Sequence, residues 1–191
     1  YPTLLASDGA RHVNTGLKLG VRIDVEPDGQ PNGTATGDDN NPPGLNDEDG
    51  VWWPFNFVPG HGNTIRVTAS APGYLNAWMD FNSNGSWADP GEQIFSNQLL
   101  SAGTTDLTMF VPANGVLGTT FARFRFSSQL NLGYTGYVQD GEVEDYQVTI
   151  TDLTNTTTVA DTTTTTAEPT TTTTTADTTT TRSASNQAAM R

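Results

Sequence analysis

Oxygen-bearing side chains recur at alternate positions from Asp80 to Ser86, in the order Asp-Phe-Asn-Ser-Asn-Gly-Ser. This order matches the first half of a D-x-[DN]-x-[DN]-G calcium loop, whose glycine lets the chain curl around a hard cation. The candidate ligands, including two acids further along that could close the shell, are Asp80, Asn82, Asn84, Ser86, Asp89 and Glu92. The pattern predicts a Ca²⁺ site, and the alternative is a turn held by its own Asp and Asn side chains without an ion.

A second group of carboxylates is crowded into a segment rich in Gly, Asn and Pro, from residue 24 to residue 50. Its candidate ligands are Asp24, Glu26, Asp28, Asp38, Asp39, Asp47 and Asp49. Acids at alternate positions of a strand point to one face and can converge on one ion. Because such crowded carboxylates repel one another, we expect a long loop folded around Ca²⁺. The alternative is an acidic loop exposed to solvent.

A third group of acids lies in residues 141–146, which read GEVEDY and begin the last predicted strand. These acids are Glu142, Glu144 and Asp145. Carboxylates beside a core are costly without a compensating charge, so they either bind an ion or pair with Arg123 and Arg125. Those two arginines share one face of a predicted strand, and a further alternative leaves them exposed to solvent. Oxygen ligands in flexible loops favour Ca²⁺ over Mg²⁺ and exclude most soft metals.

Catalysis has little support in the sequence. His12 and His61 are the only imidazoles, so neither a three-histidine zinc site nor an evident Ser-His-Asp group can be assembled. Paired carboxylates hydrolyse glycosides only when one of them lies in an apolar pocket, and these acids lie in polar loops. We therefore predict that the protein is not an enzyme.

Aromatic residues offer a different chemistry, a platform on which sugar rings stack. The candidates are Trp52, Trp53, Trp78, Trp87, Tyr134 and Tyr137. We favour the alternative that these side chains pack in the core or cover a strand face.

Short apolar alternations separated by Gly and Pro turns, without a helical period, must position these residues. Strands are expected at residues 17–25, 51–58, 64–71, 74–81, 93–95, 105–111, 119–127 and 143–150, with residues 82–91 as a loop. The spacing predicts an all-β fold, an antiparallel β-sandwich or jelly roll with calcium-binding loops over residues 1–150.

The composition favours an exterior protein. A formal net charge of -13 makes nucleic acid and anionic membranes poor partners. The absence of cysteine excludes disulfides, so Ca²⁺ is the expected staple. No apolar run approaches the roughly 18 residues that span a membrane. The lack of a signal peptide is consistent with a mature secreted chain.

Residues 151–191 form an extended, low-complexity tail or linker, because they contain no aromatic residue and 19 of the 28 residues from Thr154 to Thr181 are threonine. Such composition suggests O-glycosylation. The candidate sites are Thr156, Thr157, Thr158, Thr162, Thr163, Thr164, Thr170, Thr171 and Thr172.

The GEVEDY segment resembles the signature of the GEVED domain, a module of large secreted and surface proteins of bacteria. Further matches are DGARH at residues 8–12, GDD at 37–39, DEDGV at 47–51, WMDFN at 78–82 and ARFR at 122–125. The resemblance extends over roughly residues 1–150. It implies an extracellular β-module without specifying its task.

These observations predict a non-catalytic extracellular structural protein, secreted or on the cell surface and stabilised by Ca²⁺. It would be a subunit of a filament or matrix, a homo-oligomer in which the Thr-rich tail adds to the sheet edge of the next copy or runs along it. The alternative is a calcium-dependent ligand- or carbohydrate-binding or spacer module of a larger adhesin or secreted enzyme.

Overall fold

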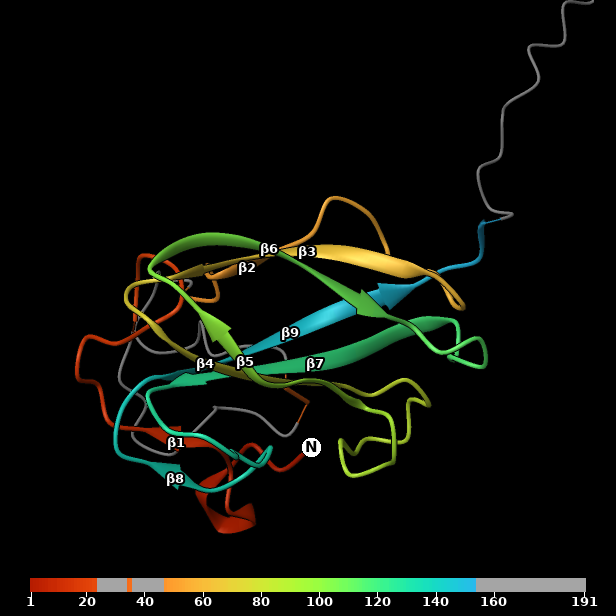
Figure 1. Cartoon of the computed structure of the whole chain (residues 1–191). Coiled ribbons are helices and arrows are strands. Elements are labelled where there is room, and N and C mark those ends of the chain that lie inside the picture. The colour runs from red at the N-terminus through yellow and green to blue at the C-terminus, as the bar shows by residue number, and fades with distance from the viewer. Residues whose placement is uncertain (24–33, 36–46, 154–191) are drawn as a thin grey trace, which may run out of the picture. The chain divides into compact units, whose positions relative to one another are not determined.

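The computed structural model describes residues 1–23, 34–35 and 47–153, and strands are its dominant regular elements (Figure 1). In this described part, the 3-10 helix η1 (Leu5–Ser7) is the only helix. No helix among these residues is long and apolar enough to cross a membrane. The predicted all-β class is confirmed.

Two antiparallel sheets form the body of the molecule. The first sheet has the order β2 (Val51–Trp52), β3 (Gly62–Ala69) and β6 (Gly103–Phe110). The second has the order β5 (Gln93–Leu100), β4 (Gly73–Met79), β7 (Gly118–Ser127) and β9 (Glu142–Ile150). Figure 1 shows the first sheet lying above the second. The chain passes between these two sheets at the connections from β3 to β4, from β5 to β6 and from β6 to β7.

The core lies between the facing sides of these sheets. The first sheet contributes Val67 and Met109, and the second contributes Leu75, Phe124 and Val148, all at most 2% exposed. Successive strand residues point to opposite faces, so the apolar alternation of β3, β7 and β9 brings one set of side chains into this core. The predicted β-sandwich is therefore confirmed.

A further layer covers the outer face of the four-stranded sheet. The parallel pair β1 (Arg11–His12) and β8 (Tyr137–Val138) lies below that sheet in Figure 1. Beside this pair, a smaller aromatic cluster includes Tyr1, Trp78, Trp87, Phe121 and Tyr134. Both faces of β4 and β7 are buried as a result, although an antiparallel sheet often leaves one face exposed.

Some predicted strand positions were wrong. Within the described part of the predicted strand 17–25, only Leu19 forms a bridge, to Ala69. The predicted strand 51–58 is reduced to β2 and an isolated parallel bridge from Phe57 to Ile150, with Pro54, which cannot donate to a ladder, between them. β5 extends from the predicted 93–95 to Leu100, through polar residues of an edge strand and a register shift.

Candidate functional site

The predicted calcium loop connects β4 to β5 and closes at its base. The amide of Met79 donates a hydrogen bond to the carbonyl of Glu92 (2.9 Å), so Asp80 and Glu92 lie at the two ends of one loop. Both are buried, with 0% and 3% of their surface exposed. Ser83 and Gly85 have positive φ angles of 55° and 84°, which turn the chain back on itself.

Hydrogen bonds link the polar side chains of this loop. Asp80 accepts from the amides of Asn84 (3.3 Å) and Gly85 (2.9 Å). Nδ2 of Asn82 and Nδ2 of Asn84 both donate to Oδ2 of Asp89, at 3.2 and 2.6 Å. The loop thus gathers the side chains of Asp80, Asn82, Asn84, Asp89 and Glu92. Ser86 is the predicted ligand through its carbonyl, and its side-chain hydroxyl accepts from the amide of Ala88 (3.0 Å) and supports the turn.

Glu92 is the one member of this group with an unsatisfied atom. Its Oε2 accepts from the amide of Asp89 (3.3 Å), whereas its buried Oε1 has no hydrogen-bond partner in the part of the chain that the structure describes. Burial, followed by the negative charges of Asp80 and Asp89, raises the pKa of Glu92 to about 7. A carboxylate in this position lacks a compensating charge.

The second acidic group lies at the start of β9. Glu142 and Glu144 share the inward face of the strand with Tyr146, Val148 and Ile150, and are 4% and 1% exposed. Oε2 of Glu142 accepts from the amide of Leu19 (2.6 Å), while its buried Oε1 has no hydrogen-bond partner among the described residues. Burial and the charge of Glu144 raise the pKa of Glu142 to about 10.

Glu144 and Tyr146 attach the segment before β2 to β9. Oε1 of Glu144 accepts from the amides of Asp49 (3.2 Å) and Gly50 (2.9 Å), and its Oε2 accepts from the hydroxyl of Tyr146 (3.1 Å). The Tyr146 hydroxyl oxygen in turn accepts from the amide of Val51 (3.0 Å). A Cβ on Gly50 would overlap that of Leu19, so this close approach requires glycine. We call Glu142, Glu144 and Tyr146 the β9 latch.

Asp145 lies on the opposite face of β9 and does not join the latch. Its carboxylate forms a two-point ion pair with Arg123, from Nε to Oδ1 (2.7 Å) and from Nη2 to Oδ2 (2.6 Å), and both side chains are fully buried. Nη1 of Arg123 also donates to the carbonyls of Pro2 and Tyr134. The predicted pairing is confirmed for Arg123 with Asp145, and the alternative of solvent-exposed arginines is wrong.

Arg125 forms no ion pair with an acid in the described part of the chain and instead contacts a histidine. Its Nε donates to Nε2 of His12 (3.0 Å), and Nδ1 of His12 donates to the carbonyl of Asp140 (2.7 Å). The Arg125 guanidinium also donates to the carbonyls of Gly133, Thr135 and Gly136. Burial, then the charge of Arg125, lowers the pKa of His12 to about 3. The imidazole is therefore a neutral structural acceptor, a role that the sequence pattern did not reveal.

The predicted ligands thus fall into two separate acidic groups. Asp47 and Asp49 lie near the β9 latch, and the negative charges of both contribute to the raised pKa of Glu142. In the part of the chain that the structure describes, no three His, Cys, Asp or Glu side chains converge on a point that could hold a metal. An ion in either group would need amide, carbonyl or water oxygens as well. The candidates outside the described residues are Asp24, Glu26, Asp28, Asp38 and Asp39, and all the predicted glycosylation sites.

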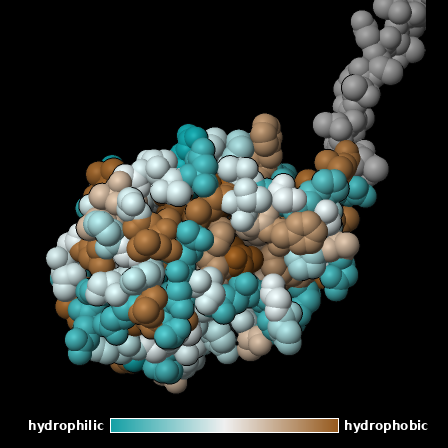
Figure 2. Space-filling view, viewed as in Figure 1, coloured by the Kyte–Doolittle hydropathy of each residue, from teal (hydrophilic) through white to brown (hydrophobic). Residues whose placement is uncertain are grey.

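Most of the predicted aromatic platform lies inside the protein. Trp78 and Trp87 are buried, and Trp53 packs against Phe57 and Tyr146. Trp52 and Tyr137, in contrast, are more than half exposed, at 55% and 59%. Exposed hydrophobic side chains occur as separate areas among hydrophilic ones on the face seen in Figure 2.

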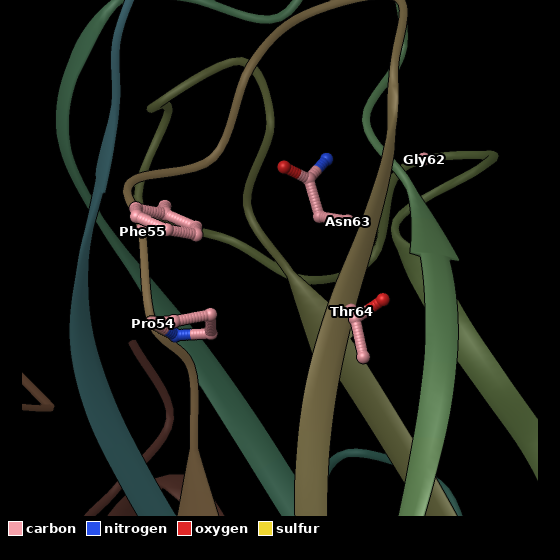
Figure 3. Close-up of a pocket in the computed structure, with 5 residues that line it drawn as sticks. All are labelled: Pro54, Phe55, Gly62, Asn63 and Thr64. Carbon is pink, nitrogen blue, oxygen red and sulfur yellow. The ribbon is translucent and has the colours of Figure 1, made fainter.

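A pocket of about 320 Å³ lies beside the first sheet. Its lining residues, drawn in Figure 3, are Pro54, Phe55, Gly62, Asn63 and Thr64. Phe55 is 81% exposed, whereas the amide group of Asn63 bonds to Val58 and His61 of its own loop. The pocket has an aromatic wall but few free polar groups.

The fold and these contacts define a β-sandwich module whose last strand fastens other parts of the chain. Residues 74–149 match the sequence model of the GEVED domain, and the chain therefore contains a GEVED domain. The family predicted from the sequence is confirmed. The match runs from β4 to β9 and includes the loop 80–92 and the latch, whereas residues 1–73 lie outside it. No curated protein matches the chain.

Proposed function

We propose that this β-module is a non-catalytic, extracellular structural protein, stabilised by Ca²⁺ and joined into a filament or surface matrix with other copies of itself. The Thr-rich segment of one copy adds as a strand to the sheet of the next. Its threonines carry O-linked sugars where they are not paired.

The open edge of β6 is the observation that supports assembly. β6 pairs with β3 along its full length, from Gly103 to Phe110, and among the described residues no strand pairs with its other side. An unpaired strand of this length presents backbone donors and acceptors to a further strand. Threonine has high β-propensity and no charge, which suits such an addition.

Electron microscopy of the purified chain with Ca²⁺ tests the proposal. We expect filaments or sheets from the full chain and none from a chain ending at residue 153. Thr108→Lys places a charge on edge strand β6 and should prevent assembly, because charges on an edge oppose strand addition. Thr64→Lys, at the paired position on central strand β3, is the control and should assemble normally. Monomers of the full chain at high concentration would refute the proposal.

A second candidate function is ligand binding at the pocket beside Phe55. The exposed rings of Phe55 and Trp52 favour a ligand with an apolar face, such as the C–H face of a sugar ring, as in a module of an adhesin or secreted enzyme. Binding on a glycan array that disappears in both Phe55→Ala and Trp52→Ala would support this function. An array with no binding would exclude it for the glycans tested.

A further inference from the structure

The loop between β4 and β5 combines ligand-type oxygens with an unexplained buried charge. Asp80, Asp89 and Glu92 are held together by hydrogen bonds within residues 80–92, and none of the three ion pairs among described residues involves them. Three carboxylates without a cation are unfavourable in a partly buried site.

The burial of Glu92 points to a bound cation independently of the clustering of acids. Glu92 is only 3% exposed, and its Oε2 accepts from the amide of Asp89. Its buried Oε1 has no hydrogen-bond partner among the described residues. Turn geometry alone accounts for Asp80, Asn82 and Asn84, which accept from backbone amides. Turn geometry does not account for Glu92, since a buried oxygen without a partner costs free energy.

The kind of ion follows from the atoms that would bind it. All side chains of the group offer oxygen, and no sulfur or imidazole lies among them. The amide nitrogens of Asn82 and Asn84 meet at Oδ2 of Asp89, so these two donors lie where a cation would contact that carboxylate. The oxygens of the two amide groups accept from the backbone amides of Asn84 and Ser86, and each keeps a second lone pair that a cation can use. A flexible oxygen-only site of this kind suits Ca²⁺ better than Mg²⁺.

We propose that residues 80–92 bind one Ca²⁺ ion, which would draw together Asp80, Asn82, Asn84, Asp89 and Oε1 of Glu92, because the three acids do not meet at one point in the structure. These are the residues that would bind the Ca²⁺ of the function proposed above. The inference rests on the calcium part of that proposal and not on filament assembly. Because Glu92 precedes β5 directly, the ion would fasten the end of β4 to the start of β5.

Isothermal titration of the full chain with CaCl₂ tests this site. Glu92→Gln keeps the shape of the side chain and removes its charge, so it should weaken Ca²⁺ binding at least tenfold. Asp106→Asn is the matched control, because Asp106 is exposed and pairs with Arg66 far along the sheet. The control should bind as the wild type does.

Thermal unfolding in EGTA separates binding from folding. Without Ca²⁺, Glu92→Gln should be at least as stable as the wild type, because the variant removes an uncompensated buried charge. With Ca²⁺, it should be less stable than the wild type. An absence of Ca²⁺ binding by the wild type, or equal binding by wild type and Glu92→Gln, would overturn the site. Filament formation is scored separately and does not enter this result.

Discussion

At the scale of single residues, Arg123 and Arg125 hold the outer face of the four-stranded sheet to the layer that covers it. Arg123 lies over the ring of Trp87 at 4.4 Å while it pairs with Asp145, and its remaining donors reach the carbonyls of Pro2 and Tyr134. A charge that is buried and fully hydrogen-bonded is tolerated, whereas losing one partner leaves the other uncompensated.

Asp145→Asn should therefore destabilise the protein by roughly 3–5 kcal/mol, because Arg123 would remain buried with its charge unpaired. Denaturant unfolding measures this change. Asp106→Asn breaks the exposed pair with Arg66 and should have little effect. Equal losses in the two variants would contradict the role of the buried pair.

His12 predicts a loss of stability in acid. Its folded pKa of about 3 lies below the ordinary value of 6.5, so the unfolded chain binds a proton between these values and the folded chain does not. This contribution is complete above pH 6.5 and decreases as the pH falls toward 3. By linkage, lowering the pH from 7.5 to 5 should remove about 2 kcal/mol through this residue.

The pH dependence of unfolding in His12→Asn measures this effect. The variant should be less stable at pH 7.5 but lose less stability on acidification than the wild type. His61→Asn serves as the control, because the exposed imidazole of His61 bonds to Pro59 of its own turn, and the pH dependence of this variant should match that of the wild type. An unchanged slope in His12→Asn would contradict the neutral imidazole.

At the scale of elements, the β9 latch fastens the first part of the chain to the GEVED domain. Glu144→Ala removes the acceptor of the Asp49 and Gly50 amides, so hydrogen exchange at these two amides should become faster and stability should fall by about 2 kcal/mol. Gln147→Ala, at an exposed position of the same strand, should change neither quantity. Unchanged exchange at Gly50 would show that the latch is unimportant.

The sequence could predict the strands whose apolar alternation is regular. β7 and β9 match predicted strands because apolar residues alternate at Ala122, Phe124 and Phe126 and at Tyr146, Val148 and Ile150. The pairing of Arg123 with Asp145 also follows from the register of these strands, in which the two residues are directly opposite. The two-residue strands β1 and β8 could not be predicted, since they have no period.

The latch could not be predicted for a different reason. Glu142 and Glu144 bind backbone amides 94 to 123 residues away, and an amide leaves no mark in a sequence. Charged residues are also rarely buried, so the pattern alone does not show that these glutamates face the core. The unsatisfied oxygen of Glu92 could not be predicted from the sequence either, because only the surroundings of the side chain show that this atom has no hydrogen-bond partner.

At the scale of the whole molecule, a sandwich without cysteine must keep its sheets and covering layer together by noncovalent contacts. The apolar core joins the sheets, the two arginines hold the covering layer, and the latch attaches the segment before β2. The loop 80–92 is the proposed point at which Ca²⁺ adds to this frame. A ligand that binds only the folded state increases stability by mass action, by about 2.7 kcal/mol when its concentration is 100 times the Kd.

Thermal unfolding of the wild-type chain in CaCl₂ and in EGTA measures how much Ca²⁺ stabilises the protein. We expect a Tm several degrees higher with Ca²⁺, increasing with its concentration and not reproduced by the same concentration of MgCl₂. Superimposable unfolding curves in CaCl₂ and EGTA would contradict it.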